Sequence, residues 1–144
     1  SAILKTKAIR AHQRPHAQLK TLRTLEKCKP QELPWRAAGT DSSDGLLTAV
    51  ENICISSNCQ AVLDPKCLPR DKYWPSGSLW DQWCINGGED FELILTLPES
   101  WAIALLEASP TCRKIGFMQS GKPQVIWKNG EEIHIFHSFV YKHF

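Results

Sequence analysis

The stretch GTDSSDGLLTAV (residues 39–50) places a short acidic and hydroxyl-rich segment directly before an apolar run with helical spacing. Asp41 and Asp44 stand three positions apart, with Ser42 and Ser43 between them. Asp and Ser are favoured at helix N-caps, because their side-chain oxygens accept hydrogen bonds from the first free N–H groups of a helix. The same N–H groups attract phosphate, and carboxylates beside them are suitable ligands for Mg²⁺. The stretch therefore predicts a helix start that serves either as a cap or as a metal and phosphate site.

Hydrophobic periodicity on both sides of this stretch predicts alternating helices and strands. Helices are expected over residues 16–28, 45–57, 79–85 and 98–108, and strands over 35–40, 58–64 and 91–97. Two late strands are expected within 112–121 and 123–136, with turns at Gly121 and at 128–130 that form hairpins. Ile94 lies on the second face of the strand FELILTL, which indicates a central strand. Together these elements predict an α/β (α+β) fold, a mixed β-sheet flanked by helices.

Length and composition favour one globular domain. The chain has 144 residues, of which 42% are hydrophobic and 22% charged, with a formal net charge of +2. No apolar run approaches the ~20 residues that a membrane-spanning helix needs, and no signal-peptide pattern is present. The six cysteines lack a CxxC pair or histidines at zinc-ligand spacing, and His134 and His137 lack an evident third ligand. We therefore expect free thiols, a reducing cytoplasm and no membrane partner.

Positive charge is concentrated at the beginning of the chain. Residues 1–30 hold eight Lys and Arg side chains against one acidic side chain, that of Glu26. A basic segment of this kind can attract nucleic acid or another polyanion. Because neither interleaved aromatic residues nor a recognised binding motif accompanies it, the pattern favours a solvated helix face and linker over a nucleic-acid partner.

The segment NGGED (residues 86–90) allows two interpretations. Gly87 and Gly88 permit a tight turn before a strand, or a close approach of the backbone to a ligand. Glu89 and Asp90 then stand at the entrance of the strand, where their carboxylates could orient a cationic or hydrogen-bonding ligand. By itself this segment predicts only a turn.

Taken together, the motifs resemble those of the thiamine-monophosphate kinases, a family of the AIR-synthase-like superfamily. The resemblance rests on five segments in matching order, namely HQRPHAQL (12–19), DSSDGL (41–46), GGEDFEL (87–93), IGFMQSGKPQVIW (115–127) and the closing YKHF (141–144). It implies an AIR-synthase C-terminal-domain fold and transfer of the γ-phosphoryl group of ATP to thiamine phosphate, which gives thiamine diphosphate. It also implies that the segment with Asp41 and Asp44 and the segment with Gly87 and Gly88 border one ligand pocket.

The resemblance assigns roles to individual residues of this chain. Asp41 and Asp44 would be Mg²⁺ ligands, Ser43 would contact ATP, and Glu89 would bind thiamine phosphate. Tyr141, aligned with an aromatic residue of the family's tail, would pack against the thiamine ring. Because the family usually has Gly before that aromatic and this chain has Val, Phe139 is the alternative.

The resemblance covers only the C-terminal domain of the family. It implies that residues 1–14 are a linker and residues 15–144 the domain. A preceding N-terminal domain would supply further aspartates, much of the nucleotide site and a homodimer contact, and this chain alone would be inactive. Two alternatives are a related ATP-dependent AIR-synthase-like domain with another substrate, and a non-catalytic module that binds nucleic acid or protein through its basic N-terminal arm.

Overall fold

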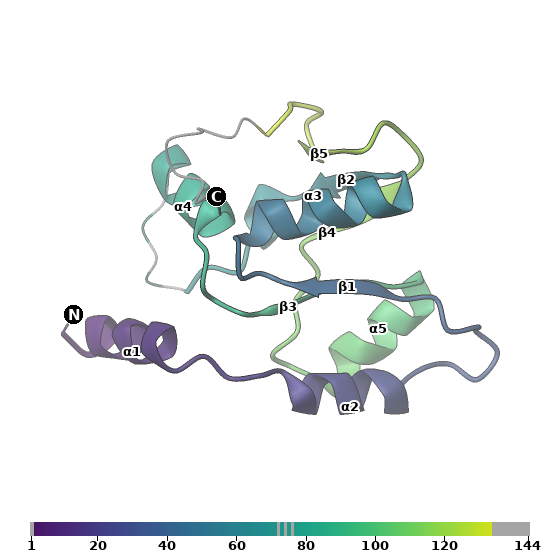
Figure 1. Cartoon of the computed structure of the whole chain (residues 1–144), viewed down its shortest axis with the longest axis horizontal. Coiled ribbons are helices and arrows are strands. Elements are labelled where there is room, and N and C mark those ends of the chain that lie inside the picture. The colour runs from purple at the N-terminus through teal and green to yellow at the C-terminus, as the bar shows by residue number, and fades with distance from the viewer. Residues whose placement is uncertain (1, 72, 74, 76, 134–144) are drawn as a thin grey trace.

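The computed structural model describes residues 2–133, apart from residues 72, 74 and 76 (Figure 1). The helices are α1 (Ala2–Gln13), α2 (Leu19–Lys27), α3 (Leu46–Ser57), α4 (Ser78–Asn86) and α5 (Glu99–Ala108), with a short 3-10 turn η1 (Pro65–Cys67). The strands are β1 (Ala38–Asp41), β2 (Gln60–Leu63), β3 (Leu93–Thr96), β4 (Gly116–Gln119) and β5 (Gln124–Trp127). The four helices that periodicity predicts are confirmed as α2 to α5. The segment predicted as a linker is mostly the helix α1, which Figure 1 shows set apart from the other helices.

Two separate sheets replace the single mixed sheet that the sequence predicts, while the mixed α/β class is confirmed. In the smaller sheet, β1 and β3 are antiparallel, with Asp41 opposite Leu93. Within the described residues β3 pairs with β1 alone, so the prediction of a central strand is not confirmed. The physical reason is that helices cover both faces of this strand. Ile94 packs toward the core around α3, and Leu95 packs toward the core around α2 and α5.

The larger sheet has the order β4-β2-β5, with β2 antiparallel to β4 and parallel to β5. The predicted hairpin between β4 and β5 is therefore wrong. Since neighbouring strands lie about 4.8 Å apart, residues 120–123 are long enough to cross over the end of β2. At Gly121 an added Cβ atom would lie 3.1 Å from Cβ of Gln60, the first residue of β2. The turn at 128–130 is confirmed, since Trp127 N donates to the carbonyl of Glu131 (2.8 Å).

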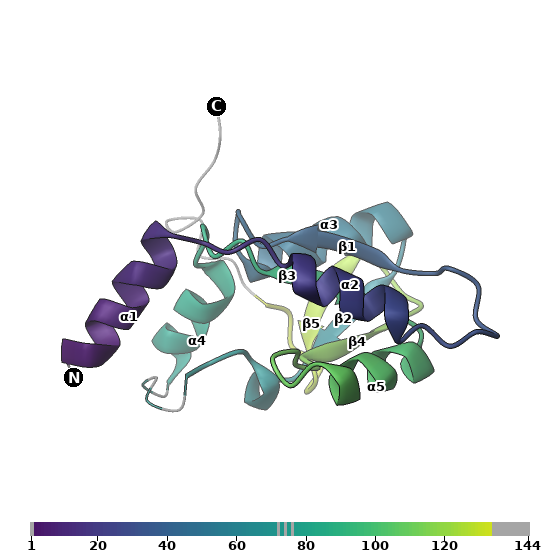
Figure 2. The same ribbon diagram turned by 90° about the horizontal axis from the view of Figure 1, so that it is seen from below.

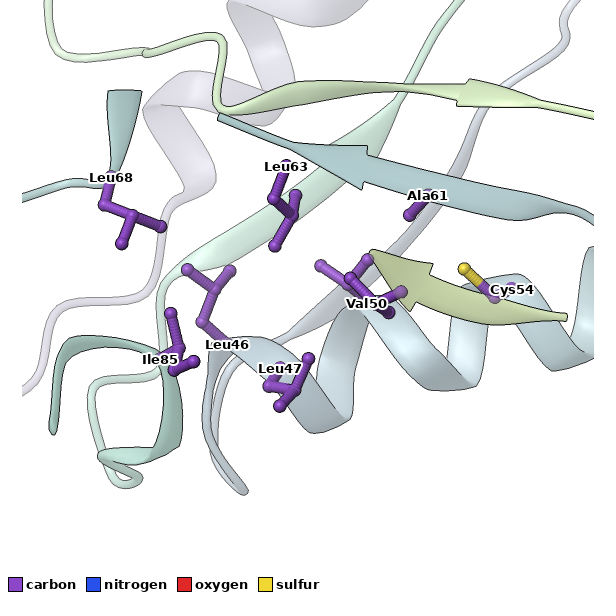
Figure 3. Close-up of a cluster of buried hydrophobic side chains, with 9 residues drawn as sticks. Leu46, Leu47, Val50, Cys54, Ala61, Leu63, Leu68 and Ile85 are labelled. Carbon is purple, nitrogen blue, oxygen red and sulfur yellow. The ribbon is translucent and has the colours of Figure 1, made fainter. Parts of the chain in front are cut away.

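The first hydrophobic core joins α3 to the larger sheet and α4 (Figure 3). Its buried members are Leu46, Leu47, Val50, Cys54, Ala61, Leu63, Leu68, Ile85 and Val125. Burial of each large aliphatic side chain contributes about 1.5–3 kcal/mol to folding before entropy is subtracted. This core fixes the N-terminus of α3 against the C-terminus of α4. It thereby holds in place the loop before α3 (residues 42–45) and the loop after α4 (residues 87–92).

The second core lies on the other side of the β1–β3 pair, where Figures 1 and 2 show α2 and α5 together. Leu25, Trp101 and Leu105 form its buried centre. Trp101 is fully buried, and its Nε1 donates a hydrogen bond to the carbonyl oxygen of Leu25 (3.0 Å). Trp35 packs edge-on against the same indole, with ring centroids 5.0 Å apart.

The expected free thiols are confirmed, because all six cysteines lie in the described part of the chain and form no disulfide. None of the helices in that part is both long and apolar enough to cross a membrane.

Candidate functional site

The corner between β1 and α3 is tied to the entrance of β3 through Ser42. This side chain is only 4% exposed. Its N–H donates to the carbonyl of Glu92 (2.9 Å), and its hydroxyl oxygen accepts from the N–H of Glu92 (3.0 Å). Sequence reasoning missed this residue as a structural anchor, although its place between two aspartates at a helix start was visible. The pair of hydrogen bonds joins segments fifty positions apart.

Backbone contact also joins the DSSDG corner to the diglycine loop. The N–H of Glu89 donates to the carbonyl oxygen of Ser43 (2.7 Å). A Cβ atom on Gly88 would lie 2.7 Å from the same oxygen, and a Cβ atom on Gly45 would lie 3.0 Å from the carbonyl of Asn86. Glycine is therefore required at both positions for this close approach, and at Gly45 also for its φ of 97°. The two motifs therefore touch through their backbones, and the expectation that they border one ligand pocket stays a prediction.

The capping interpretation of the corner is wrong. The N-cap residue of α3 is Gly45, which has no side chain to make a cap hydrogen bond. Asp41 Oδ1 instead accepts from the hydroxyl of Ser43 (2.9 Å) and, at 3.4 Å, from its N–H. The carboxylate thus orients a hydroxyl at the corner.

The corner and the loop together carry strong negative charge. Asp41, Asp44, Glu89 and Asp90 are all exposed. No group of three His, Cys, Asp or Glu side chains in the described residues is close enough to hold a metal ion. Asp41 and Asp44 could therefore supply only part of the coordination shell of Mg²⁺. This hard cation commonly takes one or two carboxylates and completes its octahedron with waters and substrate phosphates.

The entrance of β3 is electrostatically coupled to the helix α1 and its connection. Desolvation raises the pKa of Asp90, and the neighbouring His12 opposes that rise. Desolvation and the charge of Asp90 raise the pKa of Glu92, which accepts a hydrogen bond from Gln18 Nε2 (3.0 Å). Nε2 of His12 lies 3.3 Å from Oε2 of Glu89. Because both side chains of this pair are largely exposed, it contributes little to stability.

A cavity of about 260 Å³ lies beside the corner, between the α1–α2 connection, α2 and the beginning of β3. We call it the Asp41 cavity; its lining residues are Ala17, Gln18, Leu19, Leu22, Asp41, Phe91 and Leu93. Of the predicted site residues only Asp41 lines it, whereas Ser43, Asp44 and Glu89 lie outside its lining. Phe91 has a φ of 51°, a left-handed conformation that is unusual for a bulky residue.

The predicted site residues therefore fall into two groups. Asp41, Ser43, Asp44 and Glu89 come from two loops that touch through their backbones. The aromatic candidates Tyr141 and Phe139, and also the pair His134 and His137, lie outside the described residues.

Comparison with known proteins gives a consistent set of relatives. No protein-family model matches the chain. A thiamine-monophosphate kinase of Prochlorococcus marinus is 52% identical over 142 residues, which cover 99% of this chain and 43% of that protein. One from Synechococcus elongatus is 44% identical over 104 residues, or 72% of this chain and 32% of that protein.

A solved structure supports the same relationship. The crystal structure of thiamine-monophosphate kinase from Stenotrophomonas maltophilia superposes with a TM-score of 0.57 at 29% identity. It matches 67% of this chain and 32% of that chain. The present chain thus spans less than half the length of the relatives that it matches.

Proposed function

This chain is a homologue of part of the thiamine-monophosphate kinases, and on that premise we propose that it forms a phosphate-binding domain of an enzyme that transfers the γ-phosphoryl group of ATP to thiamine phosphate. The observation that carries the proposal is the 2.7 Å hydrogen bond from Glu89 N to the carbonyl of Ser43. This bond holds the loops of Ser43 and Glu89 against each other, which supports a nucleotide contact and an acceptor contact side by side. Phosphoryl transfer depends chiefly on such positioning of donor and acceptor, together with neutralisation of charge.

The residues of the corner and the neighbouring loop would have different roles in binding. Asp41 and Asp44 would hold Mg²⁺, which when bound offsets the charge of the transferred phosphoryl group. The hydroxyl of Ser43, which donates to Asp41 here, would turn to donate to an ATP phosphate oxygen near the N-terminus of α3. Glu89 would accept hydrogen bonds from the thiamine phosphate.

The negative charge of the site supports a requirement for a cation. Phosphate approaching Asp41, Asp44, Glu89 and Asp90 without one would meet like charge from several exposed carboxylates. We therefore expect ATP to bind as its magnesium complex. No activated nucleophile is needed, since the acceptor phosphate oxygen itself attacks.

Other parts of the proposal concern regions beyond the described site. An N-terminal domain in the full-length protein would complete the nucleotide site and the homodimer contact, so this chain alone would be inactive. Tyr141, or Phe139 as its alternative, would pack against the thiamine ring. The free cysteines suit a reducing cytoplasm as the location.

A chimera tests the proposal. This chain replaces the matching segment of the Prochlorococcus marinus relative, and the product of ATP and thiamine phosphate is measured with and without Mg²⁺. We expect Mg²⁺-dependent formation of thiamine diphosphate, at least 100-fold slower in Asp44→Asn (roughly 3 kcal/mol of lost transition-state stabilisation). Glu107→Gln, which changes an exposed acid on α5, is the matched control and should leave the rate unchanged.

Three outcomes would count against the proposal. Binding of ATP without use of thiamine phosphate would favour a related enzyme with another substrate. Equal rates in Asp44→Asn and Glu107→Gln would remove the metal role of the corner. Steeply salt-dependent binding of RNA or DNA, without phosphoryl transfer, would instead favour a module that uses its basic arm.

A further inference from the structure

The turn that ends α3 brings two cysteines together. Asn58, which follows the helix, has a φ of 48°, and its N–H donates to the carbonyl oxygen of Ile55 (3.4 Å). The N–H of Cys59 donates to the carbonyl oxygen of Cys54 (3.0 Å). These two bonds form a Schellman motif, in which the side chains of the first and last residues frequently pack against each other. In this chain both of those residues are cysteines.

The same backbone hydrogen bond limits the distance between the two α-carbons. With standard bond lengths, a 3.0 Å contact between the N of Cys59 and the carbonyl oxygen of Cys54 leaves their Cα atoms at most about 7 Å apart. Disulfides usually join Cα atoms about 4.4–6.8 Å apart, and pairs beyond about 7 Å need backbone movement to be bridged. The turn therefore already holds the two cysteines within reach of a disulfide.

The two thiol groups also contact each other. Cys54 is fully buried, and Figure 3 shows it on α3 among the side chains of the first core, whereas Cys59 is partly exposed. The thiol of Cys54 is hydrogen-bonded to that of Cys59, and its sulfur accepts from the N–H of Ala61. Burial, and then the neighbouring Cys59, raise the pKa of the Cys54 thiol. The pair thus combines one accessible sulfur with one sheltered sulfur.

The surroundings of the pair favour chemistry between its two sulfurs. Within the described residues no third His, Cys, Asp or Glu side chain completes a metal site around them. No backbone hydrogen bond in that part of the chain joins any two of the other four cysteines, which are Cys28, Cys67, Cys84 and Cys112. The α3 turn is therefore the place at which we expect a disulfide to form.

We propose that Cys54 and Cys59 are a reversible modification site, at which thiol–disulfide exchange with a low-molecular-weight disulfide such as oxidised glutathione forms an intramolecular disulfide. The thiolate of Cys59 attacks the small disulfide, which gives a mixed disulfide at Cys59 and releases one small thiolate. The sulfur of Cys54 then attacks the Cys59 sulfur and expels the second small thiolate. The two protein thiols are oxidised, one small disulfide is reduced, and the two released thiolates take up the two protons.

Peptide mass spectrometry tests the proposal on this chain. The folded chain is incubated with oxidised glutathione, quenched in acid, and alkylated in denaturant so that the buried thiol is also counted. The tryptic peptide of residues 37–66 contains Cys54 and Cys59 and no other cysteine. We expect this peptide to lose the mass of two hydrogens, to take up no alkylating reagent, and to regain both thiols after treatment with dithiothreitol.

Two variants separate the roles of the sulfurs. Cys59→Ser removes the accessible sulfur, so Cys54 should remain a free thiol after the same treatment. Cys112→Ser removes a cysteine outside the pair and should form the bridge as the unmodified chain does. A peptide that keeps both thiols, or that stops at a glutathione adduct on Cys59, would overturn the inference. Oxidation of Cys54 in Cys59→Ser to the same extent as in the unmodified chain would overturn it as well.

A comparison with the unfolded chain tests the part played by the turn. In glutathione buffers, the equilibrium constant for forming the bridge should be at least about 10-fold larger in the folded chain than in urea, because the Schellman motif holds the two sulfurs together. An equal or smaller constant in the folded chain would show that the native turn does not favour the disulfide, and would overturn the inference.

Discussion

Replacing Gly88 with alanine pushes a methyl group into the place where the two loops touch. The Cβ atom would lie 2.7 Å from the carbonyl oxygen of Ser43, which belongs to the backbone and not to a flexible side chain. The loops must therefore move apart, and that movement strains the 2.7 Å hydrogen bond from Glu89 N to the same oxygen. A substitution in the diglycine loop is thus expected to displace the DSSDG corner as well.

The expected cost follows from three contributions. Overpacking typically costs ~1–3 kcal/mol, and a weakened backbone hydrogen bond up to about 0.5–1.5 kcal/mol more. Alanine also restricts the unfolded chain, which returns roughly 0.4–1 kcal/mol. We therefore expect Gly88→Ala to lower the free energy of unfolding by about 1–3 kcal/mol. With an m-value of about 2 kcal/mol/M, the urea midpoint should fall by about 1 M.

Urea denaturation followed by tryptophan fluorescence measures this cost. Gly121→Ala is the matched control, because its Cβ atom would meet the side chain of Gln60 at 3.1 Å and that side chain is able to shift. We expect it to cost less than about 1 kcal/mol. If Gly88→Ala unfolds within about 0.5 kcal/mol of the unmodified chain, or costs no more than Gly121→Ala, the reasoning on loop contact is refuted.

Three further changes probe other parts of the structure. Ser42→Ala removes the acceptor of the Glu92 N–H and should cost about 0.5–1.5 kcal/mol in urea denaturation, whereas a Ser43→Ala variant that costs as much would contradict this account. Trp101→Phe removes the buried indole donor and should lower Tm by several degrees, at a cost of about 1–3 kcal/mol; an unchanged Tm would show that the hydrogen bond adds nothing. Because desolvation raises the folded-state pKa of Asp90 and Glu92 above their unfolded values, stability falls as pH rises through that window. Asp90→Asn should therefore raise Tm at about pH 7 but not at about pH 4. A lower Tm of this variant at neutral pH would contradict the predicted effect of desolvation.

Local patterns explain why most helices were predictable from the sequence. The apolar stripe of α3 and the leucine spacing of α2 are signals within single segments, and both helices occur where periodicity places them. The helix α1 has no such stripe to distinguish it from a basic linker. Its helical conformation was accordingly missed.

Strand order was not predictable, because it depends on contacts between distant segments. The period of two at residues 91–97 indicates one apolar face of β3, and Ile94 indicates an apolar contact on the other face as well. Helices that cover both faces of a two-stranded pair give the same pattern as a central strand of a larger sheet. Likewise, a turn signal at Gly121 does not reveal that β2 lies between the two strands that the turn connects.

The residues of the candidate site were predictable from the sequence, but the hydrogen bonds between them were not. The ordered motifs indicated that the Asp41–Asp44 segment and the loop with Glu89 belong together, and the structure places them in backbone contact. Capping, the local interpretation, was wrong because Gly45 has a positive φ and takes the N-cap position. The anchoring role of Ser42 needs a partner fifty positions away, which no local pattern contains.

The central claim is that the two touching loops form one ligand site. It is tested most directly by NMR of the backbone amides in this chain during titration with Mg²⁺, ATP and then thiamine phosphate. We predict that the amide signals of residues 42–46 and 87–90 shift together and give the same dissociation constant. Shifts confined to one loop, or larger shifts at a different surface with both loops unchanged, would contradict the claim.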